Sequence, residues 1–163
     1  MKFLKGYGEV TAEDVEYSLE HIAIEVGGRR SPNQAYTDMI KAVDVVNPYA
    51  VRVRLMCPNA AFLTNMSFCA NIVSNKAYGQ MGKDVVRNPI GSGQFVLGRW
   101  LPDQEAVLTA NPDYYAGLPK VKAVRFKIIE DETVAGMPMQ AGELDTIQIR
   151  TGEVYTRLRR SPR

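Results

Sequence analysis

The sequence predicts a mixed α/β fold in which short strands alternate with amphipathic helices. Three observations support this prediction. Residues 12–26 carry apolar side chains at helical spacing, residues 51–55 alternate apolar and polar side chains as a strand does, and turn residues separate such segments. The length of 163 residues suits one ordinary domain or two small subdomains, and the 45% apolar fraction is enough for a core.

The first helix is expected to begin after Thr11, which is a suitable N-cap. Asp14 follows three residues later, where an acidic or amide side chain completes a capping box. Apolar residues then recur at steps of three and four on one face, and the glycines at 27–28 suit the end of the helix. His21, the only histidine of the chain, falls off the apolar face.

The middle of the chain predicts a β-hairpin, a helix, a short strand and a second helix. In chain order these elements are expected at residues 42–46 paired with 51–55, 58–68, 72–73 and 75–85. Pro58 suits the first turn of a helix. Phe62, Leu63 and Met66 are expected to face inward from that helix.

Residues 88–93 (NPIGSG) are rich in turn formers and predict a subdomain boundary. We therefore expect a partial outer subdomain at residues 1–87 and a partial core subdomain at residues 88–163. The expected elements of the second part are strands at 94–100, 105–110, 121–129 and 144–149, and helices at 133–141 and 152–158.

Composition argues against several classes of function. The net charge is only +2, and the basic residues are scattered except at 29–30 and in the C-terminal tail, so no nucleic-acid partner is expected. No apolar run approaches the roughly 18 residues that span a bilayer. The start, MKFLKG, lacks the apolar stretch and the cleavage site of a signal peptide, so none is expected in this segment.

The inventory of reactive side chains predicts neither an enzyme nor a metal site. A single histidine offers no convincing nucleophile–base pair, and metal sites usually need three or four convergent ligands. No cofactor is expected. Cys57 and Cys69 do not form a C-x-x-C motif and flank the helix expected at 58–68. They are either a disulfide pair or two half-buried thiols.

Seven segments carry a family resemblance when they are taken in order. They are residues 11–20 (TAEDVEYSLE), 40–55 (IKAVDVVNPYAVRVRL), 58–63 (PNAAFL), 72–77 (IVSNKA), 88–95 (NPIGSGQF), 111–120 (NPDYYAGLPK) and 140–145 (QAGELD). Together they resemble the peptide- and nickel-binding family (family 5) of extracellular solute-binding proteins of ABC importers. Gln94, Ser92 and Tyr115 depart from the family's usual Pro, Thr and Trp at these positions.

The resemblance implies part of the first lobe of a class II periplasmic-binding-protein-like fold, with mixed sheets flanked by helices and the second lobe absent. It implies a substrate-binding component that captures a dipeptide or oligopeptide outside the cytoplasmic membrane, in the periplasm or an equivalent extracytoplasmic space. The captured peptide would pass to the permease subunits of an ABC transporter. Two alternatives stay open: a nickel-, sugar- or opine-binding member of the family, or a truncated module that binds no ligand and self-associates.

Two groups of residues are candidate ligand contacts. Gly91, Ser92 and Gly93 form a G-S-G turn, which either touches ligand or only gives the backbone freedom to turn between subdomains. Asn33 and Tyr36 match a segment that, by the resemblance, can place an aromatic ring beside the ligand. Otherwise these two are surface loop residues.

Overall fold

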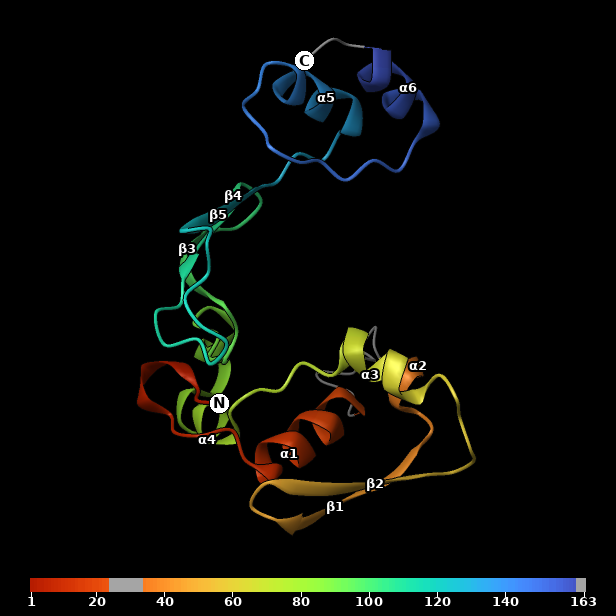
Figure 1. The fold of residues 1–163 in the computed structure, drawn as a ribbon, viewed down its shortest axis with the longest axis vertical. Coiled ribbons are helices and arrows are strands. Elements are labelled where there is room, and N and C mark those ends of the chain that lie inside the picture. Colours follow the sequence, from red (N-terminus) through yellow and green to blue (C-terminus); the bar gives the residue numbers. More distant parts are fainter. Residues whose placement is uncertain (24–33, 161–163) are drawn as a thin grey trace. The chain divides into compact units, whose positions relative to one another are not determined.

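A computed structural model describes residues 1–23 and 34–160 (Figure 1). The chain forms two compact units. The first unit consists of Met1–Leu97 with Leu108–Ala123, and the second unit consists of Gly98–Val107 with Val124–Arg163. The expected subdomain boundary at residue 88 stays a prediction, because these units are defined by contacts within this chain alone.

Helices and short antiparallel sheets alternate along the chain, which confirms the mixed α/β prediction. Up to residue 86 the elements are η1 (Leu4–Gly6), α1 (Ala12–Ala23), α2 (Gln34–Thr37), β1 (Ile40–Asn47), β2 (Ala50–Leu55), α3 (Phe62–Cys69), α4 (Asn75–Met81) and η2 (Gly82–Val86). They are followed by β3 (Phe95–Leu101), β4 (Glu105–Ala110), β5 (Ala123–Lys127), α5 (Glu132–Gln140) and α6 (Gly152–Arg160). None of the helices in the described ranges is long and apolar enough to cross a membrane.

The predicted hairpin and the first helix pack together. Strands β1 and β2 pair antiparallel, and Val43 is the buried residue of β1. Asp44 and Arg54, on the two strands, form an exposed ion pair with 2.8 Å between Nε and Oδ2. Helix α1 contacts both strands (Figure 1), and the Ala12 N–H donates to the carbonyl of Pro48 in the hairpin turn at 2.8 Å. The hairpin therefore satisfies one of the free N–H groups at the start of α1.

A small core forms where the N-terminal segment meets α4. Phe3, Ala77 and Ile90 are buried there, with exposed fractions of 5%, 0% and 3%. The partly buried side chains around them belong to Tyr7, Val10, Ile72 and Met81. The sequence pattern predicted no helix or strand in the first ten residues.

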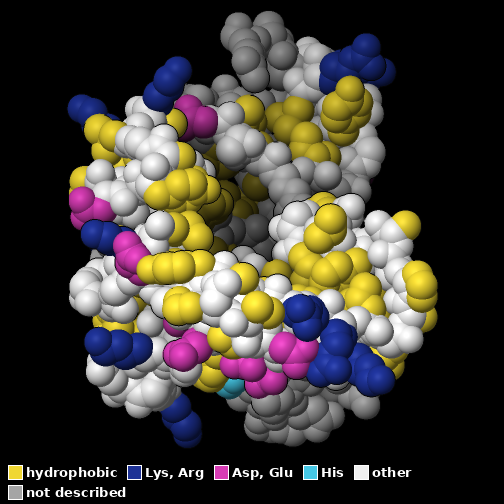
Figure 2. All heavy atoms as spheres, turned by 60° about the horizontal axis from the view of Figure 1, so that its bottom comes forward, with side chains coloured by type: hydrophobic (Ala, Val, Ile, Leu, Met, Phe, Trp, Pro, Cys, Tyr) yellow, Lys and Arg dark blue, Asp and Glu magenta, His cyan; other side chains and the backbone are white. Residues whose placement is uncertain are grey.

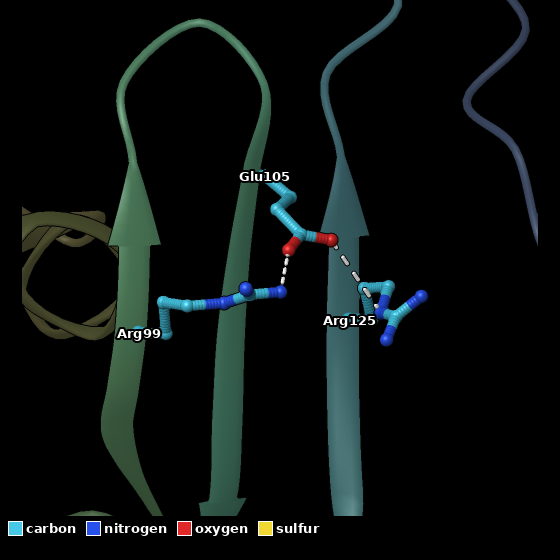
Figure 3. Close-up of polar contacts among 3 residues, drawn as sticks. All are labelled: Arg99, Glu105 and Arg125. Atoms are coloured by element: carbon cyan, nitrogen blue, oxygen red, sulfur yellow. Dashed lines mark hydrogen bonds and ion pairs between the residues drawn. The ribbon is translucent and has the colours of Figure 1, made fainter.

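Strands β3, β4 and β5 form a three-stranded sheet with β4 in the centre and neighbouring strands antiparallel (Figure 3). Glu105, at the start of β4, lies between two arginines of the outer strands. Its carboxylate pairs with the guanidinium of Arg99, and Oε2 lies 3.5 Å from Nε of Arg125 (Figure 3). The Glu105 side chain is 17% exposed, whereas both arginines are largely in solvent.

Helices α5 and α6 pack against each other in the second unit. Val154 is the buried apolar residue of α6, at 1% exposed. Arg157 reaches across from α6, and its guanidinium donates to the carbonyl of Thr133 at 2.7 Å. The guanidinium lies directly over Gly136, where a Cβ would come within 2.4 Å of it. A glycine at 136 is therefore what lets the Arg157 side chain cross α5.

Several predicted boundaries were wrong for local reasons. The helix predicted from Pro58 begins at Phe62, because the Asn59 side chain first accepts the N–H of Ala61 at 2.7 Å in a turn. Leu63 is 78% exposed and does not face inward. The run at 121–129 is a strand only at Ala123–Lys127. The run at 144–149 forms no strand, and none of the described strands pairs with it.

Candidate ligand-binding site

A pocket of about 420 Å³ lies in the first unit. Its walls come from the stretch between α3 and α4, from α4 and η2, and from the turn before β3. The lining residues are Met1, Ala70, Asn71, Ile72, Val73, Tyr78, Val85, Pro89, Ile90, Gly91, Ser92 and Gly93. The pocket thus includes the whole G-S-G turn that the sequence singled out, and none of its lining side chains is charged.

The G-S-G turn is fixed from two directions. The Leu4 N–H donates to the carbonyl of Gly91 at 3.0 Å. Asn111, only 2% exposed, donates from Nδ2 to the carbonyl of Gly93 at 2.9 Å, and its own N–H donates to the carbonyl of Gln94 at 2.9 Å. Asn111, in the N-P pair Asn111-Pro112, therefore holds the turn that follows the N-P pair Asn88-Pro89.

The glycines of the turn are not required by the backbone. Neither Gly91 nor Gly93 lies in the left-handed region. A Cβ on Gly93 would meet no atom within 4 Å, and one on Gly91 would touch only the Gly93 nitrogen, at 4.0 Å. The left-handed region is therefore not the reason for these glycines, and the expectation that they give the backbone freedom between subdomains stays a prediction. What they do provide is a stretch of pocket wall without side chains.

The opposite wall is fixed by two polar side chains of α1. Ser18, buried at 2% exposed, accepts the N–H of Val73 at 2.9 Å, and its hydroxyl lies 3.4 Å from the Val73 carbonyl. Asp14 accepts the N–H of Asn75 at 2.9 Å. The strand predicted at 72–73 is wrong: Ser18 of α1 binds the Val73 backbone, and none of the described strands pairs with this stretch.

Asp14 also closes the N-terminus of α1, as its spacing from Thr11 predicted. Its Oδ2 accepts both the N–H and the hydroxyl of Thr11, each at 2.9 Å. The carboxylate is 7% exposed and so serves the helix and the pocket wall at once. Asp14 and Ser18 lie four residues apart on one face of α1, and we call this pair the α1 clamp.

Several backbone groups of the pocket lining have no hydrogen-bond partner in the described part of the chain. Within the described part of the chain, the N–H and C=O groups of Asn71, Ile72 and Ser92 have no hydrogen-bond partner. All three residues line the pocket. In the absence of ligand these groups are left to water. An extended ligand with its own amide groups could replace that water on both walls.

Three aromatic rings meet beside the pocket. Tyr78 lines the pocket, and its ring packs edge-on against Tyr17 and His21 of α1, with ring centroids 5.7 Å and 5.6 Å away. Tyr17 and His21 stack on each other at 5.1 Å. Burial raises the pKa of the Tyr17 hydroxyl, and the nearby Tyr78 raises it further. His21, off the apolar face of its own helix, thus packs against rings and helps to hold Tyr78 in place.

The other candidate residues are not brought to this pocket by the described part of the structure. Asn33 lies outside the described residues. Tyr36 belongs to α2, but its side chain lies outside the described part, so its contact with ligand stays a prediction. Cys57 is an exposed free thiol and not a half-buried one. The side chain of Cys69 is likewise not described.

Sequence reasoning missed most of the pocket. Tyr78 was assigned to the apolar side of its helix, and Ile72 to a strand. Nothing in the linear pattern placed either of them near residues 91–93. The ranges 1–23 and 34–160 contain no group of three or more His, Cys, Asp or Glu that could hold a metal ion.

The chain matches a known family along its whole length. Residues 1–163 match the family described as bacterial extracellular solute-binding proteins, family 5 Middle. Di/tripeptide-binding protein 4 of Pseudomonas aeruginosa (strain UCBPP-PA14) is 35% identical over 131 residues, which cover 77% of this chain and 25% of that protein. Oligopeptide-binding protein AppA of Bacillus subtilis (strain 168) is 27% identical over 164 residues, covering 93% of this chain and 30% of the relative.

Solved structures share the fold. The solute-binding protein MoaA from A. tumefaciens R10, in complex with mannopinic acid, superposes with a TM-score of 0.82 at 30% identity and covers 97% of this chain. AppA from Bacillus subtilis in complex with a nonapeptide superposes with a TM-score of 0.78 at 27% identity and covers 98%. This chain spans 32% of either structure, and so about a third of their length. On the strength of the family match, the chain belongs to the bacterial extracellular solute-binding proteins of family 5 and has their periplasmic-binding-protein fold.

Proposed function

We propose that this chain is part of the substrate-binding component of an ABC importer that captures peptides outside the cytoplasmic membrane. In this proposal the chain supplies one side of a peptide site, and a longer chain or second lobe supplies the other. The bound peptide then passes to the permease subunits of the transporter. The chain acts by binding and not by catalysis, in keeping with a family of solute-binding proteins.

One observation carries the proposal: two pocket walls offer unsatisfied main-chain groups and no charged side chain. The free amides of Asn71 and Ile72 are on one wall and that of Ser92 is on the other. Main-chain recognition suits a peptide, because every peptide offers the same amide groups whatever its side chains are. The absence of a charged side chain in the lining argues against a ligand that is itself a small ion.

The division into an outer subdomain (1–87) and a core subdomain (88–163) belongs to this proposal. The G-S-G turn stands at that division and lines the pocket. The Asn111 side chain holds this turn against the first unit, so the turn is built to keep its shape while it faces a ligand.

An opine ligand is the second candidate. The relative MoaA, at 30% identity, was solved with mannopinic acid, so the same scaffold accepts a small molecule that is not a peptide. Free amide groups in the pocket would also serve such a polar ligand. Peptides remain the first choice, because the di/tripeptide-binding relative has the higher identity, 35%.

Self-association is the alternative to ligand binding. Apolar side chains are widely exposed, including Leu63 at 78% and Phe68 at 79% on α3. Figure 2 shows hydrophobic side chains spread over one face of the molecule, among basic and acidic ones. Exposed apolar surface promotes association of copies. A clean monomer by light scattering at high concentration would count against this alternative.

Isothermal titration calorimetry tests the proposal directly. The protein at its full natural length is titrated with di-, tri- and pentapeptides of neutral composition and, in parallel, with mannopinic acid. Saturable heat with peptides supports the peptide assignment. Heat with mannopinic acid alone moves the assignment to the opine class, and no heat with any of these ligands contradicts both.

A further inference from the structure

The pocket is large enough for one large side chain together with the main chain that flanks it. Its volume of about 420 Å³ lies at the low end of the roughly 300–1,000 Å³ that is usual for small-molecule sites. Two of its lining side chains, Val85 and Ile90, are buried at 3% exposed each. Ile90 also packs into the core with Phe3 and Ala77.

Tyr78 lines the pocket with an aromatic ring that neighbouring rings hold in place. Tyr17 and His21 hold its ring, and Ser74 caps its helix by accepting the Ala77 N–H at 3.2 Å. A ring fixed in this way loses little conformational freedom when a ligand packs on it. Preorganised aromatic residues in desolvated pockets tend to dominate binding energy.

The lining side chains decide which ligand side chain fits. None of the twelve lining residues has a charged side chain, and the apolar ones come from all three walls. A carboxylate or ammonium group there would give up hydration and meet no side chain of opposite charge. An aromatic or large aliphatic group would bury apolar surface against Tyr78, Ile72 and Ile90.

We infer that this pocket is a specificity subsite that takes one large apolar side chain of the bound peptide, with Tyr78 as its contact wall. The inference rests on the proposed peptide-binding function and adds a preference that this function does not imply. The free amides of Asn71, Ile72 and Ser92 hold the flanking main chain of the ligand. The subsite therefore recognises a peptide by its main chain and selects it by one side chain.

A double-mutant cycle between protein and ligand tests the inference. Calorimetry on the protein at its full natural length measures the affinities of Ala-Phe-Ala, Ala-Ala-Ala and Ala-Glu-Ala. The wild type should bind the Phe peptide on the order of tenfold more tightly than the Ala peptide, and the Glu peptide more weakly than either. In Tyr78→Ala the Phe-over-Ala preference should fall to about twofold or less, while the affinity for Ala-Ala-Ala changes little.

Two further variants distinguish the loss of the aromatic ring from a general loss of folded structure. Tyr78→Phe keeps the ring and should keep the Phe preference. Tyr155→Ala removes an exposed tyrosine of α6 and should leave all three affinities unchanged. If Tyr78→Ala fails to fold, the wild-type ranking and the Tyr78→Phe result still decide.

The outcomes distinguish the two levels of the hypothesis. Peptide binding without any Phe-over-Glu preference, or with a preference that survives Tyr78→Ala, overturns the subsite and leaves the peptide function standing. Absence of binding for all three peptides overturns the subsite together with the proposed function.

Discussion

Replacing Asp14 should separate helix α1 from the pocket wall. The carboxylate is 7% exposed and accepts three hydrogen bonds of 2.9 Å, two from Thr11 and one from the Asn75 N–H. In Asp14→Ala, the lost closure of the helix N-terminus costs about 1 kcal/mol. The Asn75 N–H left without a partner costs about 1–3 kcal/mol more. We therefore expect a loss of about 3 kcal/mol in the free energy of unfolding.

Asp14→Asn should fall between the wild type and Asp14→Ala. An amide keeps one acceptor oxygen, but it places an NH₂ group where the second acceptor was, so about half of the loss is expected. Glu20→Ala is the matched control, because Glu20 is an exposed acidic residue on the same helix. This control should change stability by less than about 0.5 kcal/mol.

Urea unfolding followed by circular dichroism measures these free energies, and amide hydrogen exchange reports on the clamp itself. The Asn75 N–H should exchange faster in Asp14→Ala than in the wild type, by a factor that reflects local opening. Equal urea midpoints for Asp14→Ala and Glu20→Ala, together with unchanged exchange at Asn75, would refute the clamp.

Three more predictions follow from the structure. Gly93→Ala should leave the free energy of unfolding within about 0.5 kcal/mol of wild type, because its Cβ meets nothing within 4 Å. Gly142→Ala, at φ +74°, should lose about 1 kcal/mol by thermal unfolding. Equal losses in the two variants would refute the conclusion that position 93 has room for a side chain. Gly136→Ala should displace the Arg157 guanidinium from the Thr133 carbonyl, but alanine is the better helix former inside α5, so the two effects should offset and leave the free energy of unfolding within about 0.5 kcal/mol of wild type. Urea unfolding compared with Arg157→Lys can check this. Hydrogen bonds from Thr133 lower the pKa of Asp131. The stabilisation of α5 by this cap is therefore fully present above the ordinary carboxyl pKa and is lost as the pH falls through the lowered value. An NMR titration of the Thr133 amide should show a midpoint below the ordinary carboxyl pKa, and Asp131→Asn should abolish that transition. A wild-type midpoint at or above the ordinary value would contradict the prediction.

Local pattern predicted most elements correctly where a helix or a strand pair is specified by its own residues. The helix after Thr11 and the hairpin at 40–55 were confirmed because side-chain periodicity and turn residues act between near neighbours in the chain. The strands predicted at 72–73 and 144–149 were wrong. Alternation says only that a run could be half-buried, and whether a partner strand is present is a long-range question.

The candidate site was predicted only in part. The turn at 91–93 was identified from its motif and does line the pocket. Neither glycine lies in the left-handed region, and the backbone freedom expected of them between subdomains stays a prediction. Tyr78 and Ile72 could not be assigned to the pocket, because a residue's period within its own helix or strand does not say which distant segment it faces.

The sequence by itself determined the family, the mixed α/β class and the position of the turn at 91–93, since these depend on residue identity and on interactions a few positions apart. The tertiary structure alone decided what the polar residues do. It joined Asp14 and Ser18 to residues 73–75 and Asn111 to the Gly93 carbonyl. Such contacts form when buried backbone groups need partners, and the nearest partner in space is often remote in the chain.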